Sequence, residues 1–478
     1  MLGYVLLSSV YAGRIEKLHQ RIPRSYAALA CLRAMVYNRS YGVNYSNRIH
    51  KGERLARVGA AAARETARAD ESLGRMKEDT MRRNTAVVLV LVVCSWLAAT
   101  DGEAEECSTA VISGAASVDG RPILWKNRDT DHLSNKVVFV RETPYSYLGI
   151  VDADDASGRR VYVGLNAAGF AIMNTVAYNL PKKMDEAEDL EGTIMADALR
   201  LCKTADDFEN YIKENAGRAL GSQANFGVID AVGGAAVFEV HNNGYRRLDA
   251  DSFPGKYILI TNFSRSGEAD KGRGYVRFDR LTELFQADED GKYSFAQILL
   301  TFARDMRNPY LFRLEPSKRA NLPADKPYYC YTQQTIDRGS TAAAVVIHGA
   351  TRGQESNGAT LWVILGEPVC GIAVPLWVEA GEAPPELSSG DAAPINQESM
   401  RLKSMLRPFK DDERVEYADL AKLENKAGTG WLSVLIAEER DIIDRTGAFL
   451  ATNPDTSAKA QFQKQIAAEV LETLKGIK

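Results

Sequence analysis

The sequence predicts an α+β fold, with antiparallel sheets at the centre and helices between and after the strands. Two blocks of short apolar strands, at about 107–263 and 341–375, are separated and followed by segments with helical periodicity. Tight turns connect neighbouring strands, whereas a parallel sheet would need a long crossover between each pair. With 45% hydrophobic residues, the 478-residue chain can fill a substantial core.

The first block consists of strands bounded by turn residues. Asp119 and Gly120 lie in the turn at 118–122, and the turns at 154–158 and 166–169 both end in glycine, which readily adopts turn conformations. These turns and the apolar runs between them predict strands at 108–113, 123–126, 136–141, 160–165, 170–174, 225–230, 235–240 and 257–261.

Helices are predicted where apolar residues recur at helical spacing. One covers 193–202, and a second follows Thr204, whose hydroxyl is suited to cap a helix N-terminus. Two further helices are expected at 276–286 and 294–306.

The second block of strands leads into a helical tail. Strands are predicted at 341–348, 360–365 and 371–375. The stretch 380–395 is rich in Pro, Gly and Ser, which predicts a loop or linker. Charged residues mixed with helical apolar periods then predict a mainly helical C-terminal extension at 396–478.

Residues 81–104 have the profile of a signal peptide. Two arginines follow Met81, an apolar run of about fourteen residues comes next, and small residues close the segment. The small residues Gly102 and Ala104 predict cleavage after Ala104, and a cut after Ala99 is an alternative. The segment therefore predicts export to the periplasm or the extracellular space, while an uncleaved membrane anchor is the competing interpretation.

The segment 1–80 shows no sustained hydrophobic period and is rich in Arg, Tyr, Ser and Ala. Such a composition does not favour a packed domain. We expect translation to start at Met81, with residues 1–80 arising from an upstream start.

Charge and metal-ligand spacing exclude several function classes. Residues 1–106 hold 16 Lys and Arg against 11 Asp and Glu, so the remainder is acidic although the chain's net charge is only −4. An acidic body argues against nucleic acid as a partner. The four cysteines after residue 106 form no Cys-x-x-Cys pattern, and the three histidines there lack metal-ligand spacing. We expect no metal and no cofactor, and a disulfide between Cys330 and Cys370 is left open.

Cys107 follows the predicted leader and opens the first strand. A cysteine at the start of a mature chain carries a thiol (pKa about 8.5) beside a free α-amine (about 7.7–8.0), so nucleophile and base belong to one residue. This arrangement requires cleavage of the bond between Glu106 and Cys107. Attack of the Cys107 thiol on its own preceding carbonyl is the economical route, and the alternative is an ordinary buried cysteine.

Several motifs, taken in order, resemble those of a known family. These motifs are Cys107-Ser-Thr, Asp119-Gly, Lys126-Asn-Arg-Asp129, the stretch from Gly164 to Asn174, Phe226-Gly-Val-Ile-Asp230 with Phe238-Glu239, Ile260-Thr-Asn262 and Arg277-Phe-Asp-Arg280. Together they resemble the linear amide C–N hydrolases, the choloylglycine hydrolase and penicillin V acylase group of N-terminal-nucleophile (Ntn) hydrolases. The resemblance covers roughly 107–375.

The resemblance implies a four-layer αββα sandwich at 107–380 and a small acylated amide as substrate. It also implies site roles. Cys107 would be the nucleophile and Asp129 would orient its amine, while Asn174 and Asn262 would donate hydrogen bonds to the oxyanion. Arg277 would lie near the thiol and favour its ionised form.

A second cation beside the thiol is left open between Lys126 and Arg128. Lys126 stands where many relatives have arginine, whereas Arg128 adjoins Asp129. Either charge would lower the pKa of a nearby thiol.

Three rival functions are also left open. The same thioester chemistry could transfer the acyl group to an amine, which would make the protein an acyltransferase. A catalytically silent binding or surface protein would keep Glu106, and a membrane-anchored scaffold would keep its leader. A homo-oligomer is a further alternative that the sequence leaves open.

Overall fold

A computed structural model describes the chain over residues 106–181, 189–215, 220–288, 290–311, 316–353, 358–409 and 413–478. The predicted signal peptide at 81–104 and the segment 1–80 lie outside these residues, as do Cys31 and Cys94. The described residues all lie in one compact unit, Asp101–Lys478.

The first of two large sheets is a six-stranded antiparallel sheet that begins with the strand after Cys107. Its strand order is β10-β1-β2-β12-β13-β14, so the sheet joins the two strand blocks of the sequence. The strands are β1 (Ser108–Ile112), β2 (Ile123–Asp129), β10 (Tyr257–Ile260), β12 (Thr341–His348), β13 (Thr360–Leu365) and β14 (Val374–Leu376).

The second large sheet is a seven-stranded antiparallel meander in which each strand pairs with the next along the chain. Short connections of this kind follow from the turn residues of the first block. The strands are β3 (Asn135–Val140), β4 (Tyr147–Asp152), β5 (Val163–Asn166), β6 (Ala171–Val176), β7 (Gln223–Ile229), β8 (Ala235–His241) and β9 (Gly244–Asp249).

The two sheets pack face to face, with β1 and β2 against β6, β7 and β8. Their inner faces approach closely at Gly227 of β7. A Cβ atom there would collide with Met173 of the same sheet and with Val111 of the opposite sheet, which explains the glycine. Apolar side chains from both sheets, including Leu124 and Val237, fill this layer of the core.

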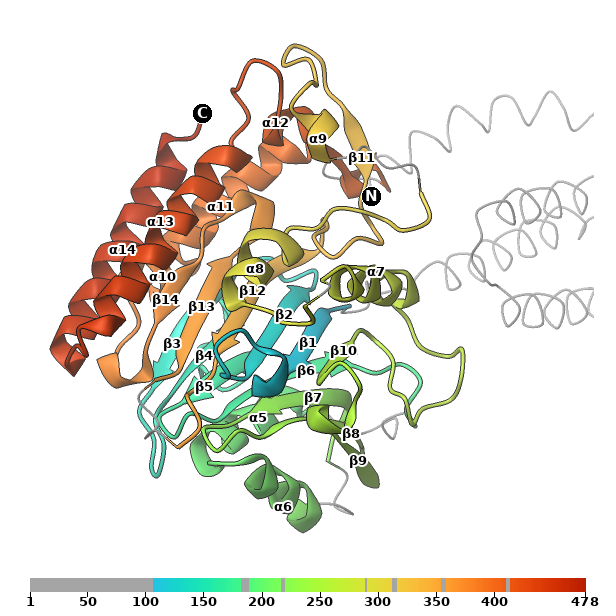
Figure 1. Ribbon diagram of the computed structural model, residues 1–478, viewed down its shortest axis with the longest axis vertical. Helices are drawn as coiled ribbons and strands as arrows, with labels where there is room; N and C mark the ends of the chain where they lie inside the picture. The colour runs from blue at the N-terminus through green and yellow to red at the C-terminus, as the bar shows by residue number, and fades with distance from the viewer. Residues whose placement is uncertain are drawn as a thin grey trace, which may run out of the picture. The chain divides into compact units, whose positions relative to one another are not determined.

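Helices cover the outer face of each sheet (Figure 1). On the seven-stranded sheet lie α5 (Glu191–Leu201) and α6 (Ala205–Asn215), with Phe208 of α6 buried among other aromatic rings. On the six-stranded sheet lie α7 (Tyr275–Gln286), α8 (Phe295–Gln297) with the π-helical turn η4 (Ile298–Phe302), and three helices of the C-terminal region. The predicted α+β fold, with its αββα layers, is confirmed.

Thr204 caps α6 as the sequence predicts. Its hydroxyl accepts a hydrogen bond from the N–H of Asp207 at 3.1 Å, and the Asp207 carboxylate accepts in return from the N–H of Thr204 at 2.9 Å. This reciprocal pair satisfies two backbone donors that the start of a helix leaves without helical partners.

The C-terminal region is mainly helical and shares the core of the six-stranded sheet. Its helices are α11 (Pro394–Leu406), α12 (Leu420–Leu423), α13 (Leu432–Ala451) and α14 (Thr456–Gly476). Apolar residues of α13 and α14, such as Ile442 and Ile466, are buried in the same cluster as the strands. The helices therefore pack as part of one core with the sheet.

Some predicted elements differ from the observed ones. The strands β4 and β9 fall where the sequence shows no clear apolar alternation, and β15 (Tyr417–Asp419), which pairs with β11 (Tyr329–Tyr331), interrupts the helical extension. The predicted loop at 380–395 contains the short helix α10 (Pro385–Ser388). Pairing across distant segments stabilises such short elements, and a local pattern does not reveal it.

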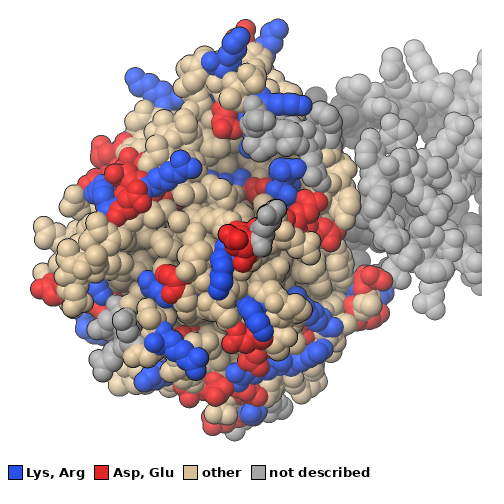
Figure 2. All heavy atoms as spheres, in the orientation of Figure 1, with Lys and Arg blue, Asp and Glu red and all other residues tan. Residues whose placement is uncertain are grey.

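The described surface carries charges of both signs. On the face drawn in Figure 2, Lys and Arg side chains are interspersed with Asp and Glu. Within the ranges that the structure describes, no helix combines the length and apolar character needed to cross a membrane.

A buried ion pair joins α13 to the six-stranded half of the molecule. Both carboxylate oxygens of Glu439 accept from the Arg304 guanidinium at 2.8 Å, and Oε2 also accepts from the N–H of Ala373 at 2.7 Å. The side chains of Arg304 and Glu439 are 3% and 0% exposed, so solvent cannot replace either partner.

We expect Glu439→Ala to lower the free energy of unfolding by about 3–5 kcal/mol, because Arg304 keeps a buried charge with no carboxylate. The matched control is Glu469→Ala, which removes a half-exposed partner of Arg445 and should cost less than about 1 kcal/mol. Urea denaturation of the three proteins measures both changes, and equal costs would contradict the assigned role of Glu439.

Candidate active site

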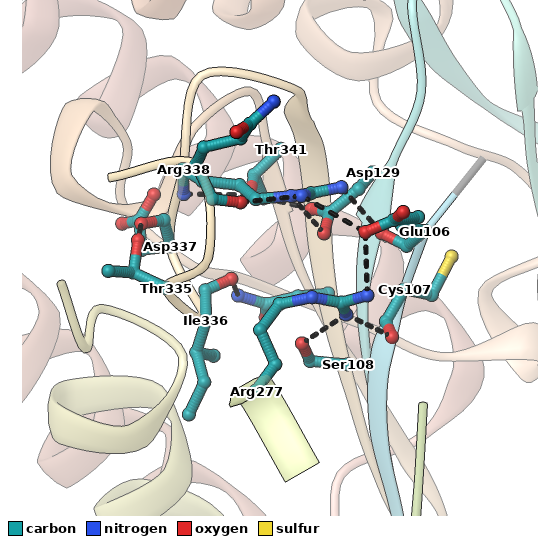
Figure 3. Close-up of polar contacts among 12 residues, drawn as sticks. Glu106, Cys107, Ser108, Asp129, Arg277, Thr335, Ile336, Asp337, Arg338 and Thr341 are labelled. Atoms are coloured by element: carbon teal, nitrogen blue, oxygen red, sulfur yellow. Dashed lines mark hydrogen bonds and ion pairs between the residues drawn. The ribbon is translucent and has the colours of Figure 1, made fainter. Parts of the chain in front are cut away.

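Cys107 lies directly before β1, between the flanking strands β10 and β2, and its side chain is 3% exposed. Ser108 pairs with Asn127, and side chains alternate between the two faces of a sheet. This alternation assigns the Cys107 side chain to the face that carries Lys126 and Arg128. In Figure 3 its sulfur points away from the Arg277 guanidinium.

The backbone nitrogen of Cys107 donates a hydrogen bond to Oδ1 of Asn262 at 2.9 Å. Asn262 follows β10, and its own Nδ2 donates to the carbonyl oxygen of Val176 at 3.0 Å. This second contact orients the amide plane so that the acceptor oxygen faces Cys107. In the uncleaved chain Asn262 is thus an acceptor for the nitrogen of the predicted nucleophile.

Arg277, in the first turn of α7, is fully buried beside the backbone of Cys107. Its Nη1 donates to the carbonyl oxygen of Cys107 at 2.6 Å and to Oγ of Ser108 at 3.0 Å, while Nη2 donates to Oδ1 of Asn262 at 2.9 Å. Gly274 precedes the helix with φ +77°, and a Cβ there would meet the Arg277 guanidinium. The glycine therefore leaves room for the arginine.

Asp129 is the last residue of β2 and is completely buried. Its carboxylate accepts from Oγ1 of Thr341 at 2.7 Å and from Nε of Arg338 at 2.8 Å. Burial raises the pKa of this carboxyl, and the positive charges of Arg338 and Arg277 oppose that rise. Its contacts link it to Cys107 through Arg338 and Glu106, and the predicted role in orienting a free amine stays a prediction.

Arg338 is a site residue that the sequence analysis missed. Besides Asp129, its guanidinium contacts the Glu106 carboxylate at 3.3 Å, the Glu106 carbonyl oxygen at 3.4 Å and the carbonyl oxygen of Gln333 at 2.7 Å. It lies in an irregular segment with no periodic pattern. The pairing of Thr341 with Asp129 brings that segment to the site, and this pairing of β12 with β2 could not be read from the sequence.

The segment 332–341, which carries Arg338, is held at both ends by α11 and the residue after it. Nζ of Lys403 donates to the carbonyl oxygen of Thr341 at 3.2 Å, and Nη1 of Arg407 donates to Oγ1 of Thr332 at 2.9 Å. The buried carboxylate of Glu367 pairs with Arg407 at 2.7 Å and with Lys403 at 3.5 Å. The C-terminal region thus fixes the segment that carries Arg338.

Glu106, the residue before Cys107, is the other unforeseen participant. Its carboxylate lies between the guanidinium groups of Arg277, at 3.1 Å, and Arg338, at 3.3 Å, as Figure 3 shows. Arg273 is a third partner at 4.0 Å. The residue before Cys107 therefore places its carboxylate against three arginines.

Lys126 and Asn174 contact each other in the layer between the sheets. Nζ of Lys126 donates to Oδ1 of Asn174 at 2.8 Å and to the carbonyl oxygen of Tyr162 at 3.2 Å. Nδ2 of Asn174 donates to the buried carboxylate of Glu191 at 3.0 Å. These contacts engage both polar atoms of the Asn174 side chain, so its predicted part in an oxyanion hole is a proposal without a described contact to Cys107.

Arg128 faces the seven-stranded sheet. It forms an ion pair with Asp152 at 2.9 Å, a hydrogen bond with Asn135, and a cation–π contact with the ring of Tyr162, whose centroid lies 3.5 Å from the guanidinium carbon. Both candidate cations, Lys126 and Arg128, thus lie on the face assigned to the Cys107 side chain.

Cys330 and Cys370 are both free thiols in the structure. Cys330 and Cys370 do not form a disulfide, so the pairing left open above is wrong. Burial raises the pKa of both thiols. Over the described ranges, no cluster of three or more His, Cys, Asp or Glu side chains has an arrangement that could hold a metal ion.

Comparisons with known proteins give distant structural similarities only. No protein-family model matches the chain, and no curated protein matches its sequence. A conjugated bile acid hydrolase from Clostridium perfringens shares 8% identity at a TM-score of 0.33, over 54% of this chain and 89% of that one.

Two further solved structures give similar values. An N-acylethanolamine-hydrolyzing acid amidase ortholog from Caenorhabditis elegans shares 13% identity at a TM-score of 0.31, over 51% of this chain and 92% of that one. A penicillin V acylase from Agrobacterium tumefaciens shares 13% identity at a TM-score of 0.32, over 57% and 86%. Similarity at this level assigns no activity to this chain.

The buried contacts of Asp129 lead to a graded stability prediction. Asp129→Asn removes the charge that pairs with buried Arg338, so we expect a loss of about 3–5 kcal/mol. Thr341→Val removes one hydrogen bond to the same carboxylate and should cost about 1.5–3 kcal/mol. Guanidinium unfolding of both variants tests this order, and a larger loss in Thr341→Val would show that the ion pair contributes little.

Proposed function

We propose that the protein is an exported cysteine hydrolase of the N-terminal-nucleophile type, which cleaves a linear amide of a small acylated molecule through a thioester on Cys107. The observation that carries this proposal is the environment of the Cys107 backbone. Its nitrogen lies 2.9 Å from Oδ1 of Asn262, and its carbonyl oxygen lies 2.6 Å from Nη1 of buried Arg277. An α-amine released at this position already has an acceptor.

Maturation would be the first reaction of the site. Sγ of Cys107 attacks the carbonyl carbon of Glu106, a C–S bond forms, the C–N bond breaks, and the departing nitrogen takes up a proton to become the α-amine. Water then hydrolyses the thioester and releases Glu105-Glu106, the two residues that cleavage after Ala104 leaves before Cys107. Nη2 of Arg338, 3.4 Å from the Glu106 carbonyl oxygen, is placed to stabilise negative charge on that oxygen.

Turnover would repeat the same steps with an external amide. The α-amine accepts the thiol proton, the thiolate attacks the amide carbonyl, and the protonated amine gives the proton to the leaving nitrogen. In this scheme Asn262 holds the α-amine through Oδ1. Nδ2 of Asn262 and Nδ2 of Asn174 donate one N–H each to Val176 and Glu191, and their second N–H groups are the proposed oxyanion donors. Asp129 acts through Arg338.

Positive charge favours the thiolate in this scheme. Arg277 contacts the Cys107 backbone directly, and Lys126 and Arg128 lie on the face of β2 to which the thiol is assigned. Cations near a thiol lower its pKa because they stabilise the charged form.

A catalytically silent protein is the second candidate, and the contacts of Glu106 favour it. A carboxylate paired with two buried arginines stabilises the uncleaved chain. An acyltransferase would use the same thioester and differ only in the acceptor that removes the acyl group.

The mass of the purified protein distinguishes the first two candidates. We expect the wild-type chain to begin at Cys107, whereas Cys107→Ala should retain Glu106 because it has no sulfur to attack the carbonyl. Wild type should hydrolyse members of a small amide panel, and Cys107→Ala should fall to the background rate with an unchanged circular dichroism spectrum. A wild-type chain that retains Glu106 would favour the silent protein.

The rate of maturation tests Arg338. We expect Arg338→Gln to slow release of Glu106 by about 10²–10³-fold, as loss of one oxyanion donor does in other enzymes. The time course is followed by mass spectrometry during expression in a cell-free system. Arg247→Gln, at a partly exposed ion pair on the outer edge of the seven-stranded sheet, is the matched control and should mature at the wild-type rate. Equal rates of Glu106 release in both variants would contradict the proposed role of Arg338.

A further inference from the structure

The carboxylate of Glu106 occupies a group of three arginines, here named the arginine cradle: Arg273, Arg277 and Arg338. Its Oε2 lies 3.1 Å from Nη2 of Arg277 and 3.3 Å from Nη1 of Arg338, and its Oε1 lies 4.0 Å from Nη1 of Arg273. The Arg277 and Arg338 side chains are 0% and 6% exposed, whereas Arg273 is 49% exposed. Two cations of the cradle are therefore buried, and one lies at its rim.

We propose that the arginine cradle binds a carboxylate on the acyl part of the substrate. This inference rests on the proposed function. Glu106 supplies the carbonyl of the bond that maturation breaks, so its acyl group forms the first thioester on Cys107. The contacts of its side chain thus mark where the acyl group of a later substrate lies.

The covalent structure of glutamate defines the substrate class more closely. Three carbon atoms separate its backbone carbonyl carbon from its side-chain carboxylate carbon. A glutaryl amide has the same spacing, and so does an α-glutamyl amide. The cradle thus favours acyl groups that carry a carboxylate at this distance from the scissile bond.

Electrostatics require an anion in the cradle once Glu106 has left. Arg277 and Arg338 would then keep the carboxylate of Asp129, which is hydrogen-bonded to Arg338, and the charge of Glu416, which also acts on Arg338. Burial and the neighbouring charge of Arg338 lower the pKa of Arg277, and Glu106 is the foremost group that opposes this. Buried cations without a counter-charge are costly, so the vacated cradle attracts a carboxylate.

The cost of leaving buried arginines without a counter-charge also lets the site discriminate between acyl groups. An acyl chain of equal length without the carboxylate would fill the space and leave both buried guanidinium groups without their partner. Sites built around such polar groups reject analogues that lack the matching group more strongly than apolar pockets do.

Two uncleavable proteins test the cradle without any catalysis. Cys107→Ala keeps Glu106 and has a filled cradle, whereas Glu106→Gly with Cys107→Ala has a vacant one. Propionate reproduces the part of the glutamate side chain that the second protein lacks. We expect propionate to raise the unfolding temperature of the double variant by about 2–4 °C and to leave the single variant unchanged, while neutral propionamide affects neither.

The result that overturns the cradle is an equal response of both proteins to propionate, or no response in either. Should the double variant be unfolded without additive, recovery of its fold in propionate alone supports the cradle. Failure to recover in propionate counts against it.

An activity comparison tests the substrate class. The 4-nitroanilides of glutaric acid and of pentanoic acid differ only in the terminal carboxylate, and those of succinic and adipic acid vary its distance. For the wild-type protein we expect kcat/KM to be at least about 100-fold higher for the glutaryl than for the pentanoyl compound. In the fraction of Arg338→Gln that has released Glu106, identified by its mass, this ratio should fall at least tenfold.

The outcomes separate the two proposals. Hydrolysis of both compounds at similar kcat/KM leaves the proposed function intact and overturns the substrate class. If the panel of amides is not hydrolysed at all, the proposed function fails and the substrate class fails with it. The response to propionate then decides whether the cradle is an anion site.

Discussion

The pairing of buried charges around the start of β1 is the constraint on which the rest of the site depends. Glu106, Asp129, Arg277 and Arg338 have little or no exposure to solvent, and each contacts at least one group of opposite charge within this set. Desolvated charges are tolerated only when such partners are fixed in place. Three elements carry these residues beside the strand β1: the end of β2, the first turn of α7 and the segment 332–341. These elements must therefore meet near Cys107, directly before β1.

The C-terminal helices contribute to that meeting although they are distant from Cys107 in sequence. Lys403 and Arg407 hold the segment that carries Arg338, and Glu367 pairs with both of them. Further along, Glu439 of α13 joins Arg304 and the backbone before β14. The helical region is thus more than a cover for the sheet, because its charges define the geometry of a segment in the site.

Local patterns predicted much of the fold and part of the site. Strand alternation and turn residues located most strands of both sheets, and the motif order placed Cys107, Asn262 and Arg277 together, where the structure has them in contact. Arg338 was missed because it lies in an irregular segment, which the pairing of β12 with β2 and the contacts of α11 bring near Cys107. Asn174 and Lys126 are adjacent in the structure, but Glu191, which accepts from Asn174, comes from a helix whose packing no motif revealed.

The hydrogen bond from the Cys107 nitrogen to Asn262 has a consequence for when the site is organised. A carbonyl oxygen can accept from a peptide N–H and equally from a protonated amine, without rotating or exchanging a proton. Val176 fixes the direction of that oxygen from the opposite side. The Asn262 side chain is therefore in position as soon as the chain folds. If the Glu106–Cys107 bond is broken later, the asparagine does not have to move.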